Sequence, residues 1–236
     1  ILGDRYGVTV NIGGENAYTD GKTINIPTLP LDCSADLLAL AKGYCDHEAA
    51  HIRHTDFAAL KAAKLTPMQK HLWNTLEDHM VEQKLATLFP GCRQHFRWLI
   101  QHHFGKDNSK VEDSNPARTV LPSLSVLNWV LLTVRAWEVP EIAEQRDTEA
   151  ATVDKAYSGL RAKLAAILSR VHQQCRNTSE AIGYALEMSA VIEAYAHKSA
   201  VPQKDTASAP KMSTSQKGEK ENDSTEIEEL PEDIKD

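Results

Sequence analysis

The sequence has few of the features that would assign it to a common class of secreted protein. It contains only four cysteines in 236 residues and no Cys-x-x-Cys pair, which excludes a disulfide-dense scaffold. Its first residues do not form the apolar core of a secretory signal, so we expect reduced thiols and a cytoplasmic protein. Because the first residue is Ile1 rather than methionine, we also expect the chain to be part of a longer protein.

Membrane-spanning and nucleotide-binding patterns are also missing. The most apolar stretch, 123–139, is shorter than the roughly 20 residues that a membrane span needs, and Asn128 and Arg135 interrupt it. We therefore predict a buried helix there and no membrane partner. The pair Gly13-Gly14 is not followed by Lys-Ser or Lys-Thr, which excludes a phosphate-binding loop of that type. The net charge of −7 is concentrated in the C-terminal tail, and the nearly neutral body neither requires nor excludes a nucleic-acid partner.

The residue pattern predicts an α+β protein, mostly helical, with a small N-terminal β-sheet within 5–30. Val8, Val10 and Ile12 alternate with polar residues, and Thr23–Ile26 forms a second short apolar run. From Ser34 onward the periodicity is helical. It indicates one helix from 34 to about 64, a second from Pro67 to about Leu88, and a helical lobe over 93–200. This lobe should include helices near 123–138, 140–175 (with a break) and 178–198.

These elements predict one domain over 1–202. Residues 203–236 are rich in Lys, Ser, Thr, Glu, Asp and Pro and have almost no large apolar residue. Such a segment cannot bury enough apolar surface to offset the entropy of ordering it. We therefore expect a disordered acidic tail or linker.

The strongest chemical signal is the motif His47-Glu48-Ala49-Ala50-His51 within the first predicted helix. Residues four apart lie on one face of a helix, so the two imidazoles can bind the same metal ion. Neutral imidazoles suit Zn²⁺, and one Zn²⁺ per chain is the predicted cofactor. Glu48 lies about 100° around the helix from His47, where its carboxylate can act as a general base on a zinc-bound water.

A catalytic zinc site needs a third protein ligand, and the second predicted helix offers two carboxylates for it. Between His51 and Glu77 lie 25 residues, enough chain for an antiparallel return. Acids between apolar residues are costly to bury unless they are paired or bind a metal. Glu77 is the preferred ligand, and Asp78 is the alternative.

Other polar residues near the motif are expected to support the site. Asp78 and Glu82 can accept a hydrogen bond from the second nitrogen of a ligand histidine. Asn74 lies on the same polar strip of the helix as these acids. A continuous helix carries His54 about 4.5 Å along the axis from His51, so His54 should line the cleft rather than bind the metal.

A segment after the second helix mixes basic and aromatic residues, an arrangement that can bind single-stranded nucleic acid. The residues that would contact DNA are Arg93, Arg97, Trp98 and Lys106. The alternative is an amphipathic helix that buries Phe96, Leu99 and Phe104 and exposes its basic residues, and we prefer this interpretation.

The run Cys45-Asp46-His47-Glu48-Ala49-Ala50-His51-Ile52-Arg53-His54-Thr55-Asp56-Phe57, followed by Trp73-Asn74-Thr75-Leu76-Glu77-Asp78, resembles the zincin-like metallopeptidase region of the CobT-like proteins. The resemblance covers roughly residues 5–100. It implies a gluzincin-type site, HExxH…NxxED, with His47, His51 and Glu77 as ligands and Glu48 as base. It also implies that a von Willebrand factor A domain follows the tail in the full-length chain.

The function expected from the motif and the resemblance is zinc-dependent hydrolysis of peptide bonds in a polypeptide substrate. The strand at Thr23–Ile26 would then be an edge strand that pairs with an extended peptide. One alternative is a non-catalytic, metal-bound interaction scaffold beside a chelatase-like ATPase. Another is a protease stimulated by single-stranded DNA.

Overall fold

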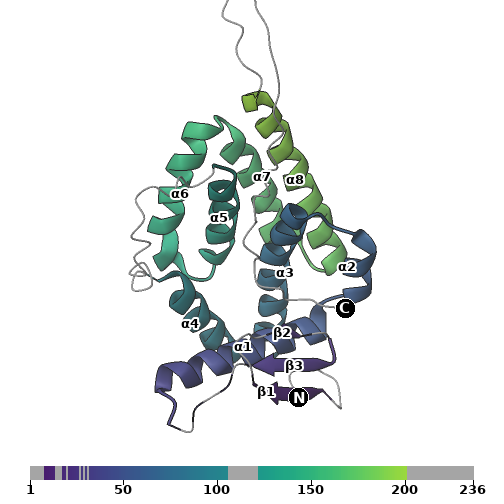
Figure 1. The fold of residues 1–236 in the computed structure, drawn as a ribbon, viewed down its shortest axis with the longest axis vertical. Coiled ribbons are helices and arrows are strands. Elements are labelled where there is room, and N and C mark those ends of the chain that lie inside the picture. The colour runs from purple at the N-terminus through teal and green to yellow at the C-terminus, as the bar shows by residue number, and fades with distance from the viewer. Residues whose placement is uncertain are drawn as a thin grey trace, which may run out of the picture.

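The structure is a computed structural model that describes residues 8–13, 18–19, 21–26, 28, 30, 32–105 and 122–200. The predicted tail at 203–236 and Lys106 lie outside these residues. A small sheet and helix α1 form one end of the described part, and helices α5–α8 form the other (Figure 1). The α+β class, mostly helical with a small N-terminal sheet, is confirmed.

The sheet has three short strands, β1 (Thr9–Ile12), β2 (Tyr18–Thr19) and β3 (Thr23–Ile26), in the order β1-β3-β2. β1 pairs parallel to β3 with Val10 beside Ile24, and β2 pairs antiparallel to it. β3 is therefore the central strand, and the prediction that it is a peptide-binding edge is wrong. Ile24 and Ile26 of β3 pack on Ala49 and Ile52 of α1, so the sheet covers one side of the motif helix.

The predicted helix from 34 to about 64 is in fact two helices, α1 (Ala35–His54) and α2 (Phe57–Ala63). The break has a local cause, because the Asp56 side chain accepts a hydrogen bond from the Ala59 N–H and starts a new helix. Thr55, between the helices, has an extended backbone, and its N–H donates to His51 O. The break thus places a threonine hydroxyl at the end of the motif helix.

Helix α3 (Pro67–Leu88) has the predicted bounds and lies at the centre of the fold. Thr66 and Gln69 form a capping box at its start, and Pro67 occupies the first turn, where its missing N–H costs nothing. α3 packs against helices from both ends of the molecule: α1, α4 (Cys92–Phe104), α5 (Pro122–Arg135) and α8 (Thr178–Ala200).

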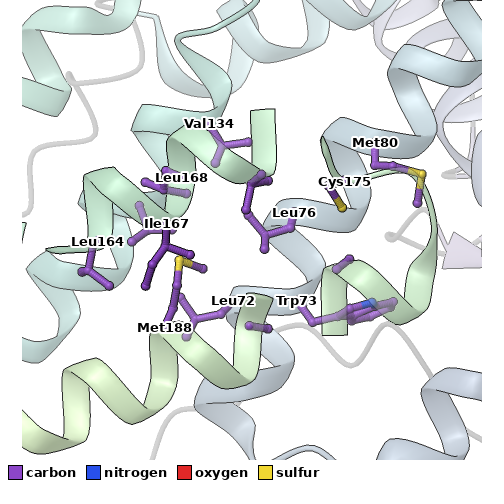
Figure 2. Packing of buried hydrophobic residues seen from close by; sticks show 14 of the residues in the cluster. Leu72, Trp73, Leu76, Met80, Val134, Leu164, Ile167, Leu168, Cys175 and Met188 are labelled. Carbon is purple, nitrogen blue, oxygen red and sulfur yellow. The ribbon is translucent and has the colours of Figure 1, made fainter. Parts of the chain in front are cut away.

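The remaining lobe contains a 3-10 turn (Pro140–Ile142), α6 (Ala143–Ala156) and α7 (Leu160–Gln174). The predicted break within 140–175 falls at Gly159, whose φ of 83° favours glycine. Leu72 and Leu76 of α3 meet Leu164 and Leu168 of α7 in the main core (Figure 2). α3 therefore shares its core with the C-terminal helices.

Candidate metal centre

Helices α1 and α3 face each other through polar residues, although the surrounding interface is apolar. On α1, His51 is 8% exposed and Glu48 is 6% exposed. On α3, Glu77 is completely buried and Asp78 is 6% exposed. Burying this many ionisable groups is costly unless each is paired or binds an ion. The contacts of each group therefore show what the site is built to do.

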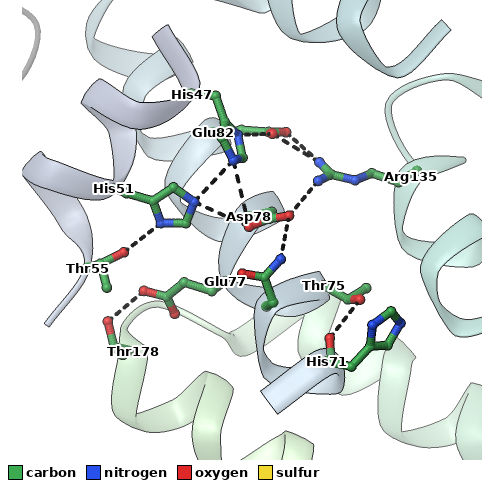
Figure 3. Close-up of polar contacts among 11 residues, drawn as sticks. His47, His51, Thr55, His71, Thr75, Glu77, Asp78, Glu82, Arg135 and Thr178 are labelled. Atoms are coloured by element: carbon green, nitrogen blue, oxygen red, sulfur yellow. Dashed lines mark hydrogen bonds and ion pairs between the residues drawn. The ribbon is translucent and has the colours of Figure 1, made fainter. Parts of the chain in front are cut away.

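His47, His51 and Asp78 converge on one point (Figure 3). The two Nε2 atoms are 3.3 Å apart, and Asp78 Oδ1 lies 3.3 Å from His51 Nε2 and 4.0 Å from His47 Nε2. Zn–N bonds of about 2.0–2.1 Å place two ligand atoms of a tetrahedral site about 3.3–3.4 Å apart. Among the described residues, this is the one group of three such side chains whose ligand atoms lie close enough to share an ion.

An orphaned acceptor shows that these residues fit a cation. Asp78 Oδ1 is buried and, apart from its contact with the histidine rings, has no hydrogen-bond partner. Its other oxygen, Oδ2, accepts hydrogen bonds from Arg135 at 2.7 Å and from Asn74 Nδ2 at 3.3 Å. The carboxylate is thus held from behind, while Oδ1 faces the two imidazoles. Two imidazoles and one carboxylate oxygen form a ligand set that suits Zn²⁺ or Co²⁺.

Glu82 and Arg135 orient His47. Glu82 Oε1 lies 2.9 Å from His47 Nδ1, and both Glu82 oxygens accept hydrogen bonds from Arg135 Nη1, at 3.0 and 2.8 Å. A hydrogen on Nδ1 leaves the Nε2 lone pair free for a metal. Burial lowers the pKa of His47, but the hydrogen bond to Glu82 and the charges of Asp78 and Glu82 outweigh it and raise that pKa to about 9. A metal at this site must therefore displace a proton from His47.

Asp78 is ionised by its surroundings. Burial alone would raise the pKa of this carboxyl, but His51 and Arg135 stabilise the charged form and lower the pKa to about 2. The site therefore presents a carboxylate, rather than a carboxylic acid, at neutral pH. That is the form that binds a metal.

Glu77, the preferred third ligand, does not join this group. Its Oε1 accepts a hydrogen bond from Thr178 Oγ1 at 2.7 Å, and its Oε2 is buried without a hydrogen-bond partner among the described residues. Successive residues of a helix are about 100° apart, so Glu77 and Asp78 face different neighbours. The structure places the alternative ligand, Asp78, beside the two histidines.

Glu48 lies in a small pocket of about 60 Å³ on the sheet side of the histidines. Its walls are formed by Tyr18, Thr19, His47, Glu48, His51, Phe57, Trp73 and Asn74. The structure thus brings Glu48 and Asn74 to the centre, as expected from the sequence. His54 lies in the last turn of α1 and is not part of the metal-binding group.

A larger cavity of about 230 Å³ lies on the Arg135 side of His47. Its walls include Leu99, Ile100 and Phe104 of α4 together with Tyr44 of α1. The Tyr44 hydroxyl is 2.8 Å from His103 Nε2. The metal-binding group therefore separates two spaces of different size.

Arg135 was not predicted to belong to the site. An arginine inside an apolar helix indicates that acids are buried nearby, but it does not identify them. Arg135 is 9% exposed and lies 53 residues from Glu82 in the chain.

Helix α4 carries three of the four residues predicted to contact DNA, and Lys106 lies outside the described residues. Arg93 Nη1 lies 3.2 Å from Glu138 Oε2, and Arg97 contacts Glu141 at 3.3 Å. Trp98 stacks on His102 with ring centroids 4.9 Å apart. DNA binding stays a prediction, and these acids would compete with phosphate for both arginines.

The fold and the site together define a mostly helical protein with a buried candidate metal centre of two histidines and one carboxylate. A family model described as "Cobalamin biosynthesis protein CobT" matches residues 1–129, more than half of the 236 residues. The chain belongs to the CobT family. The matched region contains the sheet, α1–α4 and the three converging side chains, whereas Arg135 and Thr178 lie beyond it.

Two further comparisons gave no match, one with curated proteins and one with solved structures. Among the described residues, no helix is both long enough and apolar enough to cross a membrane. The family match agrees with the CobT-like resemblance of the sequence and does not address peptidase activity.

Proposed function

We propose that the chain binds one divalent metal ion through His47, His51 and Asp78 and acts as a metal-bound scaffold in cobalamin biosynthesis, beside a chelatase-like ATPase. The observation that carries the proposal is the buried Asp78 Oδ1, which faces two imidazole nitrogens and contacts no other polar group, in a chain of the CobT family. Zn²⁺ is the expected resident ion. Co²⁺ accepts the same ligand types, and cobalt is the metal of cobalamin.

The shape of the site favours a scaffold over a peptidase. The pocket beside Glu48, about 60 Å³, is smaller than the cavity of about 230 Å³ on the Arg135 side of the histidines. β3, which was expected to bind a peptide as an edge strand, is paired on both sides. The carboxylates of Asp78 and Glu82 are held by buried ion pairs with Arg135, which fits a rigid metal-binding scaffold.

The metal assignment is tested by counting zinc per chain in purified variants. His51→Ala and Asp78→Asn should each lose stoichiometric zinc, because either change removes one of three ligands. Glu77→Gln is the matched control, a carboxylate-to-amide change one residue away, and should still bind one zinc per chain when zinc is saturating. Loss of zinc in Glu77→Gln but not in Asp78→Asn would overturn the ligand set.

The scaffold role is tested with the chelatase-like ATPase of the same source. The metal-loaded chain should form a complex of defined mass with the ATPase and support ATP-dependent insertion of Co²⁺ into a corrin, followed by absorbance. Asp78→Asn should fail in both measurements, while Glu48→Gln should behave as the parent. No complex with the metal-loaded parent would refute this role.

A second function, zinc-dependent peptide hydrolysis, is favoured by one observation: Glu48 shares a pocket with both histidines. A bound Zn²⁺ would supply a water of lowered pKa, from which Glu48 could take a proton. Glu48→Gln should then keep its zinc and lose cleavage of an unfolded protein by orders of magnitude. Equal cleavage by the parent and Glu48→Gln, or none by either, would exclude this function.

A further inference from the structure

A further cavity lies where the end of α4 meets α5 and α6 (Figure 1). Its volume of about 320 Å³ falls within the range of about 300–1,000 Å³ that is usual for small-molecule sites. Phe104 of α4 and Leu131 and Leu132 of α5 form apolar parts of its wall, and none of the three metal-binding side chains lines it. This surface suits the apolar body of a small organic ligand.

The polar part of the wall is rich in hydrogen-bond acceptors. Glu149 of α6 presents a carboxylate, and Asn128 Nδ2 holds it in place by donating to Oε1 at 3.2 Å. Gln145 Nε2 donates to Phe104 O at 3.1 Å, and this bond fixes the orientation of the Gln145 amide. The amide oxygen Oε1 is buried and has no hydrogen-bond partner among the described residues. Because a buried acceptor without a partner is costly, a ligand that donates a hydrogen bond is favoured here.

The charge of the wall also favours a cation. The last residues of α4, His103 and Phe104, line the cavity, so the negative end of the α4 dipole lies beside it. Burial is the main cause that lowers the pKa of His103 below the ordinary 6.5, so this imidazole is neutral at pH 7. Among the described residues of the wall, Glu149 is then the one side chain with a formal charge, and that charge is negative.

We propose that this cavity binds a small organic cation with a primary ammonium group on an apolar body. An ammonium group has three N–H donors and no acceptor, which matches the Glu149 carboxylate, Gln145 Oε1 and the negative end of α4. The apolar body packs on Leu131, Leu132 and Phe104. The site requires no bound metal and is therefore independent of the proposed metal centre.

The test compares 2-phenylethylammonium chloride with 2-phenylethanol, a neutral molecule of similar shape. Each compound is titrated into the ¹⁵N-labelled full chain, and the side-chain NH₂ signals of Asn128 and Gln145 are followed by NMR. The ammonium compound should shift these signals saturably and bind about tenfold more tightly than the alcohol, because hydrogen bonds between charged groups are the stronger ones.

Two variants test the wall of the cavity. Glu149→Gln removes the charge and should weaken binding of the ammonium compound about tenfold. Its matched control is Glu144→Gln, on the same helix but outside the wall, which should bind as the parent does. Leu131→Trp fills the cavity from a half-buried position and should abolish binding of both compounds, whereas Leu124→Trp, at an exposed leucine of α5, should not.

Three results would overturn the proposal. The first is the absence of a saturable shift in the parent at millimolar ligand. The second is equal affinity for the ammonium compound and the alcohol, which would indicate an apolar cavity without a cation site. The third is an equal loss of affinity in Glu149→Gln and Glu144→Gln, which would indicate a general effect of charge. If Leu131→Trp does not fold, the two glutamate variants still decide the outcome.

Discussion

Replacing Arg135 with methionine should destabilise the metal-free protein by about 3–5 kcal/mol, because it removes one partner of a buried ion-pair network. Methionine keeps much of the apolar stem that packs in α5 and removes only the charged head. Three hydrogen bonds are lost, two from Nη1 to Glu82 and one from Nη2 to Asp78.

The magnitude follows from the charge that remains. In the metal-free site, protonated His47 and Arg135 balance Asp78 and Glu82. Without Arg135, His47 still pairs with Glu82, so one unbalanced negative charge is left in a site that is less than one-tenth exposed at both acids. The expected loss of unfolding free energy is therefore about 3–5 kcal/mol, the range for a buried ion pair that has lost one partner. A divalent ion at 100 times its dissociation constant should return about 2.7 kcal/mol by preferential binding to the folded state.

Urea unfolding monitored by circular dichroism measures both quantities, with and without zinc. Arg161→Met is the matched control, because Arg161 also makes three hydrogen bonds, to Asp154, but at the surface. This exposed pair should contribute little, and the control should unfold at nearly the parental urea concentration. Equal midpoints for Arg135→Met and Arg161→Met would refute the reasoning.

Two other predictions use the same unfolding assay. Burial lowers the pKa of His79 to about 4 from the ordinary 6.5, so the folded protein keeps His79 neutral where the unfolded chain protonates it. The stability from this residue is present above pH 6.5 and is lost as the pH falls towards 4, by up to about 3 kcal/mol; His79→Gln should lose this part of the pH dependence, and an unchanged slope would contradict the assignment. Gly159→Ala should cost about 1–2 kcal/mol because its φ is 83°, whereas Gly183→Ala, in the exposed interior of α8 with no atom within 4 Å of the added Cβ, should stabilise by up to about 1 kcal/mol. If Gly159→Ala unfolded at a higher urea concentration than Gly183→Ala, backbone conformation would not explain the effects of these substitutions.

Features that depend on neighbouring residues could be predicted from the sequence. The start of α3 follows from Thr66, Pro67 and Gln69, which act within one helical turn. The shared face of His47 and His51 follows from the helical repeat alone. The sequence did not predict the end of α1 at His54, because the residue pattern is helical throughout 34–64. Asp56 ends this pattern by capping a new helix, α2, instead of continuing α1.

From the residue pattern alone it follows that two histidines share one helix face and that acids follow on a second helix. Which acid meets the histidines depends on how the helices pack. Glu77 and Asp78 differ by one position, or about 100° around α3, and the packing of α3 against α1 and α8 turns one to the histidines and the other to Thr178. Thr178 is 101 residues from Glu77, and Arg135 is 57 residues from Asp78. Contacts over such separations leave no local pattern, because they depend on how whole helices pack rather than on the spacing of residues within one helix.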